Sequence, residues 1–316
     1  MAVLVTGGAG YIGSHVARLL GDQAVIVDDL SAGLTERISG KPLLNLDLAS
    51  EAAVPRLIEF IREHDVQAVV HLAAKKKVGE SVEQPELYFR QNIGGLANLL
   101  EAMRITNVQR LVFSSSAATY GIPNVDSVSE DQDCRPINPY GETKLVGEWM
   151  CRDAGKAWGL RHANLRYFNV AGAGWPDLAD TAVANLIPIV FAALKANQRP
   201  VVFGDSYPTA DGSCVRDYVH VLDLADAHLA ALDYLDSETR EFDTFNVGSG
   251  LGHSVFEVLN VIREVTGINF EAEVLDGRPG DPAFLCANIE RINKVLGWST
   301  DRDLREIVGS AWSALG

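Results

Sequence analysis

A tyrosine and a lysine four residues apart are the side chains of this sequence best suited to take a proton from a hydroxyl group. Asn138 can cap a helix and Pro139 suits its first position, so Tyr140 and Lys144 should lie on one helix face. A tyrosine that acts as a base near neutral pH needs its pKa lowered from about 10 toward 7, which corresponds to about 4 kcal/mol. The ammonium group one turn away favours the phenolate in that sense.

Three consecutive serines precede this pair in the chain. Ser114, Ser115 and Ser116 follow an apolar run at 111–113 that is typical of a buried strand, so their hydroxyls should lie at its carboxyl end. A serine there can bridge a substrate oxygen. A Tyr-x-x-x-Lys spacing alone is also common on surface helices, but the order of motifs along the chain favours a catalytic set. We therefore expect that set to be Ser116, Tyr140 and Lys144.

A glycine loop follows the first apolar run of the chain, at 3–5, and opens a helical pattern. Its G-x-x-G-x-x-G spacing is formed by Gly7, Gly10 and Gly13. Glycine lets the backbone approach a pyrophosphate, which the helix N-terminus stabilises. The second apolar run ends at Asp28-Asp29, and a carboxylate at Asp28 would accept bonds from ribose hydroxyls and repel a 2′-phosphate. The loop thus predicts NAD binding, and a cationic nicotinamide would further lower the pKa of Tyr140.

Apolar runs and helical patterns alternate through the first half of the chain. Buried strands are expected at 3–5, 24–27, 68–71, 111–113 and 163–165, and helices where Ile12, Val16, Leu19 and Leu20, and then Val54, Leu57, Ile58 and Ile61, recur. This order predicts an α/β fold with a doubly wound parallel sheet of the Rossmann type. After about residue 170 the loops lengthen. We expect an NAD-binding domain at 1–170, to which part of 215–250 returns, and a smaller, interleaved domain at 171–316.

Composition excludes several classes of protein. A net charge of −15 argues against nucleic-acid or anionic-membrane partners. Neither a signal peptide nor an apolar stretch of about 18 residues is visible. The four cysteines are far apart, so we expect reduced thiols, no metal site and a cytoplasmic location.

Over nearly its full length the sequence resembles the UDP-glucose 4-epimerase family of extended short-chain dehydrogenases/reductases. The segments that carry the resemblance are 4–14, 78–81, 113–116, 138–141, 165–169, 207–209, 211–212, 215–221 and 278–281. The resemblance implies that Tyr140 takes the proton of the sugar O4 while C4 gives a hydride to NAD. The 4-keto sugar then turns over and receives the hydride on its other face. UDP-glucose and UDP-galactose would be interconverted, with NAD staying bound.

The resemblance also assigns binding residues. The cofactor contacts that the glycine loop, the strand ends and the family match imply are Gly7, Gly10, Tyr11, Ile12, Gly13, Asp28, Asp29, Leu30, Asp47, Leu48, Lys76, Asn92, Ser114, Tyr140, Lys144 and Tyr167. The substrate contacts are Lys77, Ser116, Tyr140, Asn169, Asn185, Leu186, Phe203, Arg216, Arg278 and Asp281. Arg216 and Arg278 can hold a pyrophosphate between two guanidinium groups, or form surface salt bridges. Phe203 is equally suited to a core position, Asn92 to a helix, and Asp281 to a turn cap.

Two positions depart from the family pattern. Lys77 follows Lys75 and Lys76 where the family usually has a smaller or neutral residue, so it could pair with a carboxylate at C6 and favour UDP-glucuronate, or remain a solvated lysine. Leu285 stands where the family makes room for an N-acetyl group, which disfavours UDP-N-acetylhexosamines.

Two rival functions share the expected fold. A sugar-nucleotide dehydratase needs an Asp-Glu pair after the hydroxyl residue, and this chain has Ala117-Ala118 there. A non-catalytic NAD-binding protein would not need Ser116, Tyr140 and Lys144 together. The resemblance further implies a homodimer through helices near 82–104 and 139–158.

Overall fold

The computed structural model describes residues 1–237, 242–278 and 280–316. The chain divides into two compact units. The first comprises Met1–Gly121, Cys134–Arg166 and Ala225–Phe245, and the second comprises Ile122–Asp133, Tyr167–Leu224 and Asn246–Gly316. Each unit is described by itself below.

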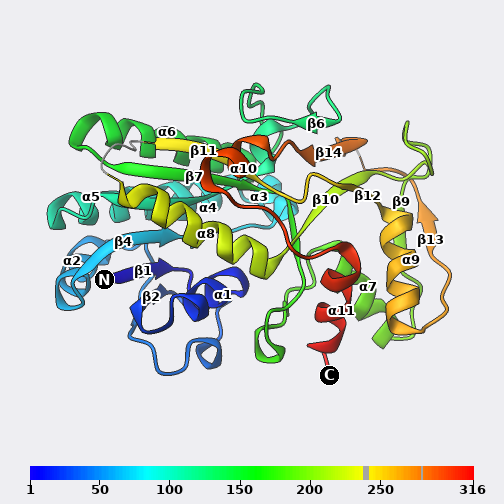
Figure 1. The fold of residues 1–316 in the computed structure, drawn as a ribbon, viewed down its shortest axis with the longest axis horizontal. Helices are drawn as coiled ribbons and strands as arrows, with labels where there is room; N and C mark the ends of the chain where they lie inside the picture. The colour runs from blue at the N-terminus through cyan, green and yellow to red at the C-terminus, as the bar shows by residue number, and fades with distance from the viewer. Residues whose placement is uncertain (238–241, 279) are drawn as a thin grey trace. The chain divides into compact units, whose positions relative to one another are not determined.

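The first unit is built on a sheet whose described strands run in the order β11-β7-β5-β4-β1-β2-β3 (Figure 1). Their bounds are β1 Ala2–Thr6, β2 Ala24–Asp28, β3 Leu43–Asn45, β4 Val66–His71, β5 Arg110–Ser116, β7 Arg161–Tyr167 and β11 Phe242–Val247. β1 pairs in parallel with β2 and β4, β2 with β3, and β4 with β5. The doubly wound parallel sheet is confirmed. Its order reverses between β1 and β4, where such sheets bind ligands at the carboxyl ends of the strands.

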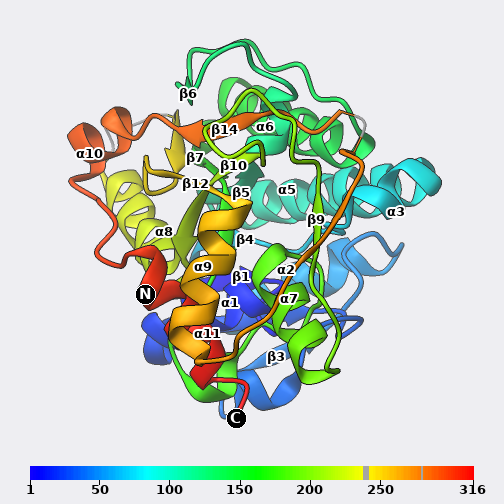
Figure 2. The same ribbon diagram turned by 90° about the vertical axis from the view of Figure 1, so that its right-hand side faces the viewer.

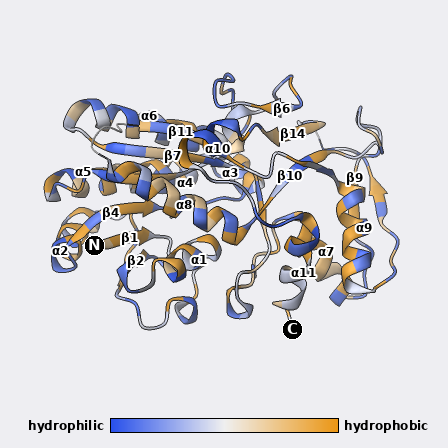
Figure 3. Cartoon of the chain, in the orientation of Figure 1, coloured by the Kyte–Doolittle hydropathy of each residue, from blue (hydrophilic) through white to orange (hydrophobic). Residues whose placement is uncertain are grey.

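Helices cover both faces of this sheet. They are α1 Tyr11–Leu19, α2 Ala53–Glu63, α3 Val78–Glu83, α4 Pro85–Tyr88, α5 Gly95–Thr106 and α6 Pro139–Trp158, with α8 Val221–Asp236 entering from the second unit. Figure 2 shows the strands between α5 on one side and α8 on the other. One core cluster joins the strands to α2, α5 and α6 through side chains such as Leu57, Leu99 and Leu111, all 0% exposed. Figure 3 shows β1 as largely hydrophobic, as expected for a strand covered on both faces, whereas β7 carries a long hydrophilic stretch.

The second unit contains shorter strands and four α-helices among its described residues. The strands are β6 Ser127–Val128, β8 Asn169–Ala171, β9 Val201–Phe203, β10 Val215–His220, β12 Gly252–Ser254, β13 Glu273–Leu275 and β14 Phe284–Ala287. The helices that pack on its core are α7 Leu186–Lys195, α9 Val255–Thr266 and α11 Leu304–Ser313; α10 Glu290–Leu296 is short. Residues 122–133 belong here because β6 pairs with β14 and Asn246 Nδ2 donates to the Val128 carbonyl at 2.7 Å.

In the described part of the chain, every helix is too short or too polar to serve as a membrane span.

Candidate active site

The catalytic pair expected from the sequence stands on the first turns of α6. Asn138 caps this helix, because its Oδ1 accepts from the Gly141 amide at 2.9 Å, and Pro139 occupies the first helical position. Tyr140 and Lys144 therefore lie one turn apart on the same helix face, as predicted, and the Lys144 ammonium is 5.9 Å from the centroid of the Tyr140 ring.

Lys144 is buried and fixed against β5. Its side chain is only 4% exposed, and Nζ donates to the Ser114 carbonyl at 2.7 Å. Nζ also lies 5.4 Å from the centroid of the Phe113 ring. Because the ammonium group is buried and its charge is poorly solvated, the pKa of Lys144 is lowered to about 8.

Tyr140 contacts the expected serine. Burial raises the pKa of the Tyr140 phenol, and a hydrogen bond with Ser116 lowers it by a smaller amount. In the protein alone the net direction is upward, opposite to the expected lowering, because burial outweighs the polar contact. Ser116 Oγ accepts from the Ala118 amide at 3.1 Å, which orients the hydroxyl at the end of β5.

A buried polar network next to this pair was not predicted from the sequence. Glu148, one turn beyond Lys144 on α6, accepts from Ser115 Oγ and from Arg166 Nε at 2.8 Å. Arg166 Nη2 donates to the other carboxylate oxygen at 2.6 Å, and Nη1 donates to the Tyr120 hydroxyl at 3.0 Å. The spacing of Tyr140, Lys144 and Glu148, four residues each, is a signal that could have placed Glu148 on the catalytic face.

The ends of β1 and β4 are joined by a buried histidine. His71 Nδ1 and Thr6 Oγ1 are 2.7 Å apart, and the His71 ring stacks on Phe113 at 5.9 Å. Burial and the nearby Lys144 lower the pKa of His71 to about 3, so this imidazole is neutral near pH 7.

The glycine loop has the geometry that a dinucleotide needs. Gly10 is the N-cap of α1 and makes no side-chain cap bond, so the amides of the first turn, Tyr11, Ile12 and Gly13, point out of the helix end. Gly7 has φ +70°, and a Cβ there would lie 2.7 Å from the Ala73 amide nitrogen. Only glycine fits this close passage of two backbones.

Asp28, at the end of β2, supports the same loop. Its Oδ2 accepts from the Ala9 amide at 3.0 Å and its Oδ1 from the Leu30 amide at 2.8 Å. Burial raises the pKa of Asp28, and the two backbone bonds oppose that rise. A carboxylate has about four acceptor sites, so capacity for a ribose hydroxyl remains. Asp29 Oδ1 accepts from the Ser31 amide at 2.9 Å, and Leu30 adopts φ 58°.

Of the other expected cofactor contacts in the first unit, Asp47 and Leu48 are engaged in hydrogen bonds within the protein, whereas Lys76 is exposed to solvent. Asp47 accepts from the Ala49 amide at 2.8 Å, and the Leu48 carbonyl accepts from Asn98. Lys76, like Lys77, is exposed.

Asn92 lies in a π-helical segment, Phe89–Gly94, between α4 and α5. Its amide accepts from the Lys75 amide at 2.8 Å and donates to the Lys75 carbonyl and to Thr143 Oγ1. These bonds tie the loop after β4 to α6, so the side chain is a structural clamp as well as an expected cofactor contact.

In the second unit, Arg216 is held by the segment after Arg278. Arg216 Nη1 donates to the Pro282 carbonyl at 2.7 Å, and Nη2 is 3.5 Å from the Asp281 carboxylate. Arg278 stacks on Phe203, with its guanidinium carbon 3.8 Å from the ring centroid. Arg278 is exposed and Phe203 only partly buried, so neither is a core residue. Leu285 pairs with Arg216 between β14 and β10.

The remaining expected contacts also fall in the second unit. Tyr167, an expected cofactor contact, ends β7. Of the expected substrate contacts, Asn169 begins β8, Asn185 is the exposed N-cap of α7 without a side-chain bond, and Leu186 begins that helix.

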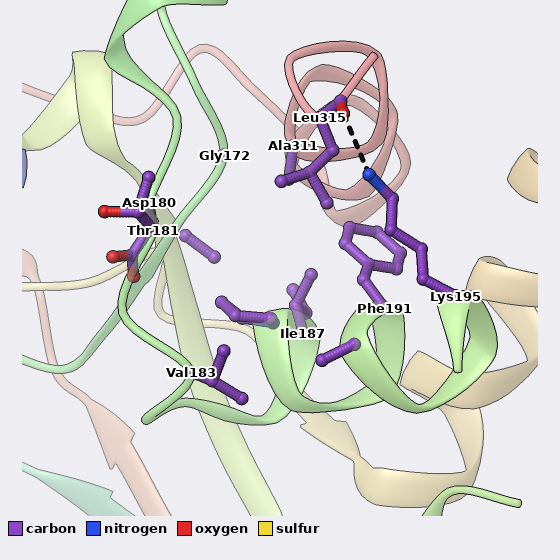
Figure 4. A pocket seen from close by; sticks show the side chains of 12 residues that line it. Gly172, Asp180, Thr181, Val183, Ile187, Phe191, Lys195, Ala311 and Leu315 are labelled. Atoms are coloured by element: carbon purple, nitrogen blue, oxygen red, sulfur yellow. Dashed lines mark hydrogen bonds between the residues drawn. The ribbon is translucent and has the colours of Figure 1, made fainter. Parts of the chain in front are cut away.

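A small apolar hollow of about 140 Å³ lies elsewhere in the second unit (Figure 4). Its walls include Val183, Ile187, Phe191 and Leu315, and Lys195 Nζ donates to the Leu315 carbonyl at 2.8 Å. None of the expected site residues lines it. Over residues 1–237, 242–278 and 280–316, no group of three or more His, Cys, Asp or Glu side chains is arranged to hold a metal ion.

The chain has close relatives among characterised proteins and solved structures. It is 46% identical over 320 residues to a UDP-glucose 4-epimerase of Azospirillum brasilense, covering 98% of this chain and 91% of that protein. It is 42% identical to the UDP-glucose 4-epimerase of Halalkalibacterium halodurans, covering 99% and 95%. The crystal structure of UDP-glucose-4-epimerase from Stenotrophomonas maltophila with bound NAD and formylated UDP-arabinopyranose matches with a TM-score of 0.94 at 38% identity, covering 99% and 97%.

Residues 3–248 match the NAD dependent epimerase/dehydratase family. The resemblance noted from the motifs is thereby confirmed, and so is NAD as the cofactor of the family. This chain belongs to the NAD dependent epimerase/dehydratase family.

Proposed function

We propose that this enzyme interconverts UDP-glucose and UDP-galactose by inverting carbon 4 of the sugar. The observation that carries the proposal is the convergence of Ser116, Tyr140 and Lys144 at the end of β5 and the start of α6. The relatives named UDP-glucose 4-epimerase support the choice of substrate. Ala117 and Ala118 follow Ser116 in place of the acidic pair that a dehydratase would need, which favours epimerisation over elimination.

The first unit fits NAD. The uncapped N-terminus of α1 suits the pyrophosphate, the close passage at Gly7 leaves room only for backbone, and Asp28 suits a ribose. NAD would be held by the residues of this loop and strand end, with Lys76, Asn92, Ser114 and Tyr167 as further contacts. When bound, it supplies the reversible oxidation of carbon 4.

The side chains of this unit then handle the proton. Tyr140 takes the proton from the sugar 4-hydroxyl and returns it, and Ser116 donates a hydrogen bond to the same oxygen. Lys144 holds a positive charge within one helical turn of Tyr140. Because burial raises the pKa of Tyr140 in the protein alone, Tyr140 depends on a second positive charge, such as an oxidised nicotinamide, to work near neutral pH.

The second unit supplies the contacts for the UDP part. Arg216 and Arg278 bring two guanidinium groups to the pyrophosphate, and Phe203 offers a ring face for the base. Asn169, Asn185, Leu186 and Asp281 complete the set. The stacking of Arg278 on Phe203 and the pairing of Arg216 with Asp281 keep these groups ordered on partly exposed surface.

Two finer points belong to the same proposal. UDP-glucuronate is the alternative substrate, because the exposed ammonium group of Lys77 is free to pair with a carboxylate at C6 of the sugar. The chain acts as a cytoplasmic homodimer through the helices near 82–104 and 139–158, where Val82 is 62%, Phe89 39% and Trp149 46% exposed. Sedimentation velocity tests the dimer, and a monomer at micromolar concentration would refute it.

The substrate is tested by giving the purified protein UDP-glucose and UDP-glucuronate separately and identifying the products by NMR. Formation of UDP-galactose from UDP-glucose alone supports the main proposal, and Lys77 then plays no part in selection. A preference for UDP-glucuronate supports the alternative. The absence of a 4-epimer from either would refute the substrate assignment.

A further inference from the structure

A stripe of three side chains on α6 meets the three consecutive serines of β5. Tyr140, Lys144 and Glu148 are spaced by four residues, so they project from the same helix face. Tyr140 bonds to Ser116 and Lys144 Nζ to the Ser114 carbonyl, while Glu148 accepts from Ser115 Oγ. Two of these contacts belong to the catalytic set, and the third does not.

The third contact is part of a buried ion pair. Glu148 is 6% exposed and Arg166, on β7, is also 6% exposed. Arg166 holds both carboxylate oxygens through Nε and Nη2, at 2.8 and 2.6 Å. This two-point geometry fixes the orientation of both groups, whereas a single contact would allow rotation.

The same arginine reaches the chain on the other side of Ser116. Its Nη1 donates to the Tyr120 hydroxyl at 3.0 Å, and its guanidinium lies 4.9 Å from the centroid of the Tyr120 ring. Tyr120 ends the short 3₁₀ segment that follows Ser116. The ion pair therefore binds the side chain of the residue immediately before Ser116, which is Ser115, and of the residue four positions after it, which is Tyr120.

A buried ion pair adds little net stability, because the cost of removing both charges from water offsets their attraction. The directional hydrogen bonds of the Glu148–Arg166 pair nevertheless favour one arrangement of α6, β7 and β5, the elements that bear Glu148, Arg166 and Ser115. We propose that the Glu148–Arg166 pair is a positioning device that holds α6 in register with β5, so that Tyr140 and Lys144 stay aligned with Ser116. Both residues act through the catalytic set and do not touch the substrate. This inference rests on the proposed epimerase activity.

The main test replaces the pair by apolar side chains of similar volume, Glu148→Leu with Arg166→Met, in the full chain with its bound cofactor. Such exchanges usually preserve folding. A misalignment of about 1 Å can cost about 100-fold in rate, so we expect kcat to fall about 10- to 100-fold. The KM for UDP-glucose and the amount of bound NAD should stay within about 2-fold, because most of the contacts expected for them lie in the glycine loop, at Asp28 and in the second unit. A loss of stability alone would not lower kcat while leaving the KM and the amount of bound NAD unchanged.

A matched control is the same exchange at another buried carboxylate, Asp223→Leu with Arg302→Met. The Asp223 carboxylate accepts hydrogen bonds from the guanidinium group and from the backbone amide of Arg302. Neither residue touches the catalytic set. We expect kcat to stay near that of the unmodified enzyme.

Ser115→Ala keeps the ion pair and removes only its link to β5. We expect a fall in kcat of about 3- to 10-fold, from a misalignment smaller than about 1 Å. This variant decides the matter if the double exchange fails to fold.

An unchanged kcat in Ser115→Ala, or in a folded double variant, would overturn the inference. If the unmodified enzyme epimerises neither UDP-glucose nor UDP-glucuronate, the proposed function fails instead, so the two failures are distinguishable.

Discussion

Replacing Lys144 by methionine should abolish most activity while leaving the folded chain as stable as before or more stable. Burial lowers the pKa of Lys144 from its usual 10.5 to about 8. At about 1.4 kcal/mol per pKa unit, the ammonium form is about 3 kcal/mol less favourable in the folded chain than in the unfolded chain. Nζ also makes a charged hydrogen bond to the Ser114 carbonyl, which is worth about 1.5 to 3 kcal/mol and is lost in the variant.

The net effect depends on pH with a defined sign. Below pH 8 both states carry the ammonium, so the whole cost is present and Lys144→Met should be about 0 to 1.5 kcal/mol more stable than the unmodified chain. Between pH 8 and 10.5 the folded state loses its proton before the unfolded state does. The unmodified chain therefore gains stability as pH rises through this window. Near pH 10.5 the cost has gone and the hydrogen bond remains, so the variant should become the less stable of the two.

Urea unfolding at pH 7, 8, 9 and 10, with matched NAD content, measures this difference. Epimerisation by Lys144→Met at pH 7 should be at least about 100-fold slower. A variant that is more than 1 kcal/mol less stable at pH 7, or a stability difference that stays constant from pH 7 to 10, would refute the reasoning about the buried ammonium.

Two further predictions concern the site, and a third concerns His162, a buried histidine of β7 that is 1% exposed. Tyr140→Phe should keep its fold and bound NAD but lose at least about 100-fold in kcat, because the acid–base group is gone; a smaller loss would move the proton transfer to another residue. Arg216→Lys should raise the KM for UDP-glucose about 10-fold with kcat nearly unchanged, since lysine cannot reproduce the fork of guanidinium donors; steady-state kinetics decides, and an unchanged KM would remove Arg216 from the binding set. Burial lowers the pKa of His162 to about 4, well below its usual 6.5, so its stabilisation is present above pH 6.5 and is lost as pH falls toward 4. His162→Phe should therefore shift the acid-unfolding midpoint, followed by circular dichroism, to lower pH, and a midpoint that stays or rises would contradict this.

Local spacing was sufficient to predict the main strands and the shared helix face of Tyr140 and Lys144. The strand patterns at 3–5, 24–27, 68–71, 111–113 and 163–165 each lie inside a strand of the central sheet. The helix pattern placed Tyr140 and Lys144 together because i and i+4 positions depend only on the helix itself. The cap at Asn138 formed as expected for the same reason.

Contacts between distant parts of the chain could not be derived from such patterns. The partner of Glu148 is Arg166 on another strand, and the partner of Asn92 is the backbone of Lys75. Periodicity indicates that a position is buried, but it does not say which polar group meets it there. The rise that burial causes in the pKa of Tyr140 could not be derived either, because the cost of burial depends on packing that a sequence does not show.

The most direct test of the central claim follows epimerisation of UDP-glucose in D₂O by NMR, without added NAD. If carbon 4 is oxidised and reduced on the enzyme, the UDP-galactose formed should keep hydrogen, and not deuterium, at carbon 4. Tyr140→Phe should form little or none of it. Deuterium at carbon 4, or turnover only with added NAD, would contradict an epimerase that retains its cofactor and uses Tyr140 only for the hydroxyl proton.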